Sequence, residues 1–155
     1  MPKDLKIALK VSNFLWPNIE IREESVFLQE ALTGNSSSVE SFSSLTEAEI
    51  FHNHVHVLDL FKHEASLEEE PFWDQHHPDF DAACRLGKTA VQTWTAKLRM
   101  DAPNRPFVVI YTQNDNPIVR FHQRRDREPG YLEPDDWKQE IQAGEVIVSV
   151  IKGND

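Results

Sequence analysis

Alternating apolar and polar positions mark the first segment of the chain. From residue 5 to residue 12, large apolar side chains alternate with lysine, alanine and serine. This period of two predicts a half-buried strand whose lysines face solvent. Residues 19–22 alternate in the same way and predict a second strand that returns as a hairpin, while residues 25–32 fit a strand or a short helix. We therefore expect residues 1–33 to form an N-terminal β segment appended to the main fold.

A serine-rich stretch separates this segment from the rest of the chain. Residues 34–44 hold six serines and few large apolar residues, a composition typical of flexible linkers. Residues 45–155 are then expected to form the core of a single domain. A chain of 155 residues is long enough to bury such a core without metals or disulfides.

The stretch from Leu45 to His63 predicts a central helix. Thr46 is followed three residues later by Glu49, a capping box that satisfies amides of the first turn. We expect the helix to end near Glu64. Its core-facing side, at helical spacing, consists of Ile50, His54, Val57, Leu58 and Phe61.

A second, longer helix is predicted to begin at Pro78, a residue suited to a first helical turn. Its apolar stripe repeats at steps of four and three and consists of Phe80, Cys84, Gly87, Val91, Trp94 and Leu98. Glycine in mid-helix costs about 1 kcal/mol relative to alanine. Gly87 therefore indicates close approach to a neighbouring element, which we expect to be the central helix.

Residues 107–113 predict the clearest strand, and residues 118–124 predict its partner across a turn at residues 114–117. If these four turn residues form the whole loop, the two faces of the hairpin separate well. The face expected to pack on the helices consists of Val108, Ile110, Thr112, Val119 and Phe121. The opposite face, aromatic and basic, consists of Phe107, Val109, Tyr111, Arg120, His122 and Arg124.

The C-terminal part completes the fold. Residues 134–143 predict a short helix that stops at Gly144, and residues 146–151 predict a last strand. Strands first, then two helices, a hairpin and a final strand favour an α+β fold over an alternating parallel sheet. We predict an antiparallel sheet of four to five strands with two long helices packed on one face.

Composition limits the partners of the protein. With 26 acidic and 16 basic residues, the formal net charge is -10, so we expect it to bind neither nucleic acid nor membrane. A single cysteine excludes an intramolecular disulfide. No apolar run resembles a signal peptide or a membrane span, and we expect a cytoplasmic protein. The N-terminal segment can stay on its own domain or pair with another subunit, so a homo-oligomer is compatible with the sequence.

Histidines give the first candidate site. On the predicted central helix, one polar face consists of His52, His56, Asp59 and His63. Imidazole nitrogens and carboxylate oxygens suit a divalent transition metal such as zinc. One helix cannot close a tetrahedral shell, so a further ligand would come from the acidic residues 64–81, where His76 and His77 lie. The alternative is a solvated polar face with no cofactor at all. His54, on the apolar side, is expected to bond a backbone carbonyl in the core.

The basic hairpin face gives the second candidate site, formed by Tyr111, Arg120, His122 and Arg124. Arginine offers a planar fork to carboxylate or phosphate, and tyrosine offers a ring for stacking. This surface suits a protein partner or an anionic small molecule. The alternative is that these bases pair with the chain's own acids, in residues 64–81 or 133–140.

Motifs for common enzymes are missing from the sequence. It contains no glycine-rich phosphate loop, nucleophile elbow, paired-cysteine metal motif or dinucleotide fingerprint, so enzymatic activity has no support. We predict a small acidic binding or protein-interaction domain that uses the hairpin face. A metal-binding protein or metal-dependent enzyme that uses the histidine face is the alternative.

Overall fold

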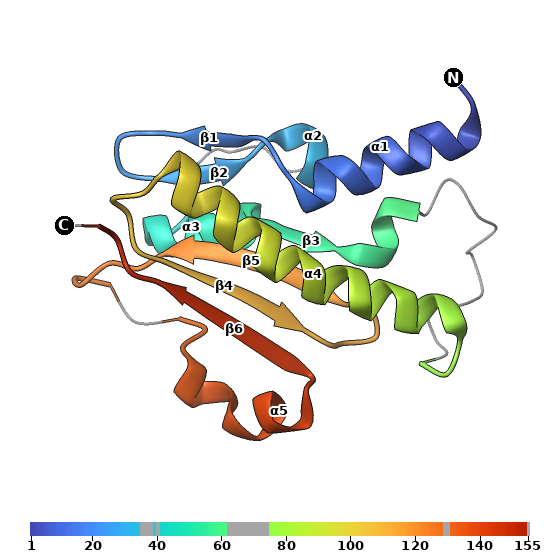
Figure 1. Ribbon diagram of the computed structural model, residues 1–155. Helices are drawn as coiled ribbons and strands as arrows, with labels where there is room; N and C mark the ends of the chain where they lie inside the picture. Colours follow the sequence, from blue (N-terminus) through green and yellow to red (C-terminus); the bar gives the residue numbers. More distant parts are fainter. Residues whose placement is uncertain (35–38, 40, 62–74, 129–130, 155) are drawn as a thin grey trace.

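The computed structural model describes residues 1–34, 39, 41–61, 75–128 and 131–154. An antiparallel four-stranded sheet in the order β3-β5-β4-β6 lies at its centre (Figure 1). Its strands are β3 (His54–His56), β4 (Phe107–Thr112), β5 (Ile118–Gln123) and β6 (Val146–Ile151). The predicted α+β fold with an antiparallel sheet is confirmed.

Helix α4 (Pro78–Asp101) packs on one face of this sheet. It begins where the sequence predicts, with Pro78 in its first turn, and Nδ1 of His77 accepts a hydrogen bond from the Asp79 amide at 3.1 Å. The predicted apolar stripe is buried over its whole length. The apolar residues keep a helical spacing along these 24 residues, so a strand does not fit this segment.

Gly87 is the point at which α4 comes very close to the sheet. A Cβ atom on Gly87 would lie 2.8 Å from Cε2 of Tyr111 and 3.4 Å from Cγ2 of Val57. The predicted close approach is therefore present. The neighbours are strand β4 and the 3₁₀ helix η1 (Val57–Phe61), rather than a long central helix.

Replacing Gly87 with alanine is expected to destabilise the protein, although alanine is the better helix former by about 1 kcal/mol. The new methyl group meets the fully buried Tyr111 ring, and overpacking of this kind costs about 1–3 kcal/mol. Urea denaturation should show a lower free energy of unfolding. In a Tyr111→Leu background the ring is gone, and the same substitution should stabilise. A stabilising effect in the wild-type background would contradict the close contact.

The first residues form a helix, α1 (Lys3–Leu15), so the strand predicted at residues 5–12 is wrong. Apolar residues at a period of two also supply a helical stripe, because Ile7, Val11 and Phe14 are spaced by four and three. Phe14 is fully buried, whereas Leu5 and Leu9 are 49% and 45% exposed. The stripe that includes Phe14 therefore determines the conformation.

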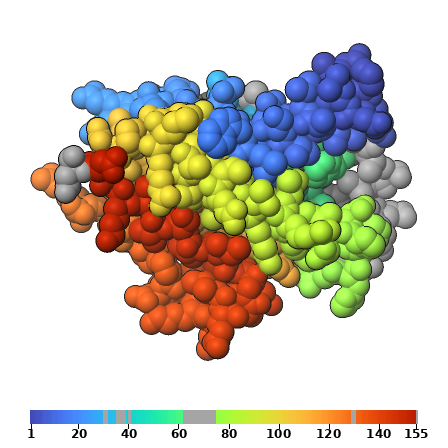
Figure 2. Space-filling view, in the orientation of Figure 1, coloured from blue at the N-terminus to red at the C-terminus, as the bar shows by residue number. Residues whose placement is uncertain are grey.

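Helix α1 packs against α4 on the same side of the sheet (Figures 1 and 2). The ring of Phe14 meets the ring of Trp94 edge-on at 5.8 Å between centroids. The Trp94 indole N–H donates to the Phe14 carbonyl at 2.7 Å. Two long helices on one face are thus present as predicted, but they are α1 and α4.

A two-stranded hairpin and a short helix follow α1. They are β1 (Ile19–Ile21), β2 (Val26–Leu28) and α2 (Glu30–Thr33). The strand predicted at residues 19–22 is confirmed, and residues 25–32 contain a strand and the start of a helix. Val26 and Leu28 lie in the same core as α4, so the N-terminal segment is part of the main fold and not an appendage. The serine-rich linker lies partly outside the described residues, at 35–38 and 40.

The predicted central helix stops after two turns, as α3 (Leu45–His52). Asn53 ends it: its side-chain amide donates to the Val26 carbonyl at 2.7 Å, and its Oδ1 accepts from the Leu28 amide at 2.8 Å. The chain then becomes β3, where His54 pairs with Arg120. Satisfying the buried backbone of β2 and β5 outweighs the helical spacing of the sequence.

The cap of α3 also differs from the prediction. Ser44 is the N-cap and accepts from the Glu47 amide at 3.1 Å. Thr46 is buried, and its amide donates to Glu128 at 3.0 Å. Burial raises the pKa of the Glu128 carboxyl, but hydrogen bonds from Thr46 and the charge of Arg125 outweigh burial and hold this pKa below its usual value.

The helix and the strand predicted for the C-terminal part are present, with β6 at the edge of the sheet. The 3₁₀ helix η2 (Pro134–Trp137) leads into α5 (Lys138–Ala143), which ends at Gly144 in a left-handed conformation with φ 76°. Strand β6 then pairs with β4. In the part of the chain that the structure describes, no helix is long and apolar enough to cross a membrane.

Candidate functional site

The register of the hairpin decides which side chains share the candidate surface. Thr112 pairs with Ile118 and Ile110 pairs with Arg120, so the loop between the strands covers residues 113–117. It is one residue longer than predicted, and an extra residue moves every side chain of β4 to the other face. Arg120 therefore shares its face with Ile110, and the predicted face that holds both Tyr111 and Arg120 is wrong.

Tyr111 lies under α4 and is fully buried. Its hydroxyl makes no hydrogen bond within the described residues. Burial, and then the neighbouring Cys84 thiol, raise the pKa of the Tyr111 hydroxyl. The side chain belongs to the core and is not available for the predicted stacking on a ligand.

His122 and Arg124 are occupied by other parts of the chain. His122 is 1% exposed, and its Nδ1 and Nε2 atoms each lie 2.9 Å from a carbonyl oxygen, of Gln123 and Tyr131. Arg124 forms an ion pair with Glu133 at 3.2 Å. Of the two alternatives for the basic face, Arg124 therefore follows the second: it pairs with an acid of the protein itself.

Arg120 is the member of the predicted set for which no ion pair is found within the described residues. Its Nε atom is buried without a hydrogen-bond partner among the described residues. Burial lowers the pKa of this guanidinium, because the charged form loses hydration. The other partly buried arginines are bonded: Arg22 to Glu20, Arg105 to hairpin carbonyls and Arg125 to Glu49.

A surface pocket of about 380 Å³ includes Arg120. Helix α3, the turn before it and strand β3 supply the rest of its wall: Phe42, Glu47, Ile50, Phe51, His54 and His56. His54 stands directly opposite Arg120 in the β3–β5 register, so both side chains leave the sheet on the face away from α4. Nδ1 of His54 contacts the Phe51 carbonyl, the backbone contact that the sequence predicts, although His54 is only half buried.

Four side-chain rings contact one another in succession along the wall of this pocket. Ring centroids lie 5.2 Å apart between Phe42 and Phe51, 5.9 Å apart between Phe51 and His54, and 5.3 Å apart between His54 and His56. Phe51 is 48% exposed, an unusual position for a large aromatic ring. The pocket thus combines an aromatic wall with a guanidinium.

The predicted histidine face does not form on one helix. His52 is buried among the rings of Phe27, Phe42 and Phe51. His56 lies on β3, and Asp59 accepts a hydrogen bond from Asn116 at 3.0 Å.

His63 and most of the acidic connection lie outside the described residues. Within the described ranges, no three histidine, cysteine or acidic side chains converge to hold a metal. The four predicted metal ligands therefore do not lie on one helix. Metal binding itself stays a prediction.

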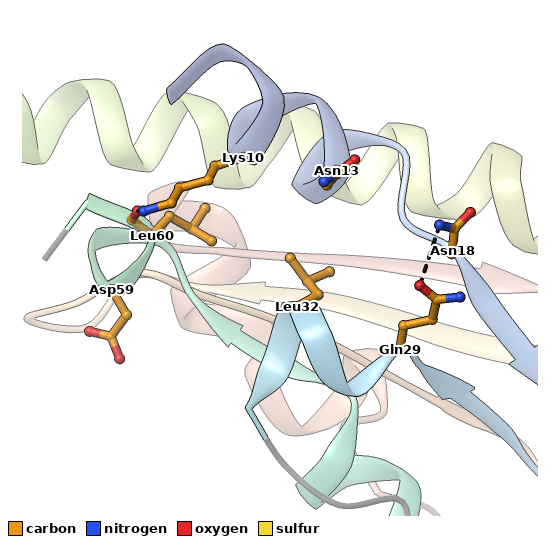
Figure 3. Close-up of a pocket in the computed structure, with 7 residues that line it drawn as sticks. All are labelled: Lys10, Asn13, Asn18, Gln29, Leu32, Asp59 and Leu60. Carbon is orange, nitrogen blue, oxygen red and sulfur yellow. Dashed lines mark hydrogen bonds between the residues drawn. The ribbon is translucent and has the colours of Figure 1, made fainter. Parts of the chain in front are cut away.

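A second pocket of about 250 Å³ lies between α1, the hairpin and η1 (Figure 3). Two hydrogen bonds cross this pocket: Lys10 donates to the Leu60 carbonyl, and Asn18 donates to Gln29, both at 3.4 Å. Asp59 points away from the other labelled side chains. This pocket is a seam between packed elements and makes the weaker candidate.

Sequence reasoning missed the aromatic half of the Arg120 pocket. Phe51 falls outside the apolar stripe of the predicted helix, and Phe42 is the one aromatic residue of the serine-rich stretch. The position of Phe51 outside the stripe was a signal of an exposed ring, whereas Phe42 is half-buried. Comparisons with protein-family models, curated proteins and solved structures find no match to this chain. Function is therefore inferred from the chemistry of the Arg120 pocket.

Proposed function

We propose that the protein is a small binding domain that captures an anionic group at Arg120. One observation supports this most directly: in a protein of net charge -10, Arg120 is partly buried, and its buried Nε atom has no hydrogen-bond partner among the described residues. A buried charge without a partner is costly. With ten more acids than bases available, an arginine left unpaired in a pocket favours an external anion as its partner.

The chemistry of the pocket fits this role. Arginine presents a planar fork that bonds carboxylate or phosphate through two N–H groups. Hydrogen bonds to charged groups contribute about 1.5–3 kcal/mol. His54, on the neighbouring strand, lines the same pocket.

Titration with sodium acetate and with inorganic phosphate tests the proposal. In heteronuclear NMR spectra, we expect saturable shifts at the Arg120 Nε–H group and at the amides of β3. Arg120→Gln removes the charge-assisted bonds and should weaken binding of both anions by about tenfold or more. The melting temperature should stay unchanged or rise, because the buried Nε atom of Arg120 has no hydrogen-bond partner among the described residues.

Arg124→Gln is the matched control. Arg124 is a neighbouring arginine that already pairs with Glu133 and does not line the Arg120 pocket. This variant should bind acetate and phosphate as tightly as the wild type. Equal loss in both variants would indicate a general charge effect, and a large loss of stability in Arg120→Gln would indicate a structural role. Either result would refute the proposal.

A further inference from the structure

We propose that the ligand of the Arg120 pocket is a small aromatic carboxylate. This inference rests on the proposed function and specifies the class of ligand that the domain binds. The carboxylate is bound by Arg120, and the aromatic ring packs against Phe42 and Phe51. Each half of this ligand matches one half of the pocket.

The aromatic half is supported by the exposed ring of Phe51. Phe42 and Phe51 lie 5.2 Å apart with an angle of 43° between their planes, and both line the pocket beside Ile50. Aromatic rings prefer offset or edge-on neighbours at about 4.5–7 Å. A third ring placed in the pocket completes such a cluster and covers Phe51, which is 48% exposed.

The carboxylate half is supported by Glu47. This residue lines the same pocket, and its own carboxylate is held by the amide of Ser43 at 3.1 Å and by the Ser43 hydroxyl. A fixed negative charge in the wall of the pocket tolerates one negative charge on a ligand better than two. Glu47 therefore selects a carboxylate over a phosphate dianion.

The size of the pocket supports a small molecule. A volume of about 380 Å³ lies at the small end of ligand pockets, which range over about 300–1,000 Å³. A single ring with one acidic group fits this space. The ring that would pack on the ligand, Phe51, belongs to α3, and the arginine that would bind its carboxylate, Arg120, belongs to β5.

Isothermal titration calorimetry with benzoate, acetate and phenyl phosphate tests the inference. Burying a phenyl ring favours benzoate, so benzoate should bind about tenfold tighter than acetate. Phe51→Leu should reduce this preference to about threefold or less and leave acetate binding unchanged. Phe42→Leu is a second variant with the same expected effect. Benzoate should also bind more tightly than phenyl phosphate, and Glu47→Gln should narrow that difference.

Trp16→Leu is the matched control, because Trp16 is also an exposed aromatic residue, 45% accessible, but does not line this pocket. It should keep the preference for benzoate. Equal binding of benzoate and acetate, with both lost in Arg120→Gln, would overturn the aromatic class and leave anion capture intact. Tighter binding of phenyl phosphate than of benzoate would overturn the carboxylate assignment. Failure of all three probes to bind would refute both proposals.

Discussion

Replacing Glu49 with alanine is expected to lower the free energy of unfolding by about 3–5 kcal/mol, because it breaks a buried ion pair. Glu49 is fully buried, and both carboxylate oxygens accept bonds from the Arg125 guanidinium at 2.9 Å. The same oxygens accept the amides of Val26 at 2.9 Å and Gln123 at 2.7 Å. One side chain thus joins α3, β2 and the end of β5. Its loss removes the ion-pair partner of Arg125 and leaves the amides of Val26 and Gln123 without their acceptor.

Glu133→Ala is the control for this prediction. It also removes the acid of an arginine–glutamate pair, but the Arg124–Glu133 pair lies at the surface, and such pairs contribute about 0–1 kcal/mol. Urea denaturation of both variants gives the comparison. Losses of similar size would show that Glu49 does not have the structural role described above. Because α3 also carries Phe51 and Glu47, the Glu49 variant should weaken benzoate binding as well.

Trp94→Ala is expected to cost about 3–5 kcal/mol, the range for loss of a large buried aromatic ring. Trp94 packs edge-on against Phe14 of α1 and Phe121 of β5, with centroids 5.8 Å and 6.0 Å away. Its indole N–H also bonds the Phe14 carbonyl at the end of α1. The substitution therefore removes a buried ring contact and a hydrogen bond that join α1 to α4.

Hydrogen exchange gives this second prediction a specific readout. In Trp94→Phe, which keeps a ring but loses the indole N–H, the amides of α1 should exchange faster while those of β4 change little. Met100→Ala, in the same helix at a 59% exposed position, should change stability by less than about 0.5 kcal/mol. Uniform acceleration across the whole protein would contradict a local role of Trp94 at α1.

The sequence predicted the elements in which one periodicity has no competitor. The stripe of α4 continues from Phe80 to Leu98, and the strands of the hairpin are rich in β-branched residues. It failed where two periodicities fit the same residues, as in α1. The sequence also did not predict that the central helix ends at Asn53. The hydrogen bonds of Asn53 to β2 depend on the tertiary structure, which no local pattern reveals.

The candidate site was predictable only in part. Arg120 was identified because a basic residue in a strand of an acidic protein is conspicuous. Its true neighbours were not, since a loop of residues 113–117 instead of 114–117 reverses the faces of the two strands. The rings of Phe42 and Phe51 come from segments that meet β5 only in the folded chain.

The edge of β2 that does not pair with β1 is closed by Glu49 of α3 and by Asn53, which ends α3. Glu49 accepts the Val26 amide, and Asn53 bonds both the Val26 carbonyl and the Leu28 amide. An open strand edge invites pairing with another chain, but here two side chains occupy the backbone groups that an incoming strand would use. The hairpin can therefore recruit a further strand through β2 only by giving up the bonds of Glu49 and Asn53, so the same contacts that hold the fold together also guard this edge against aggregation.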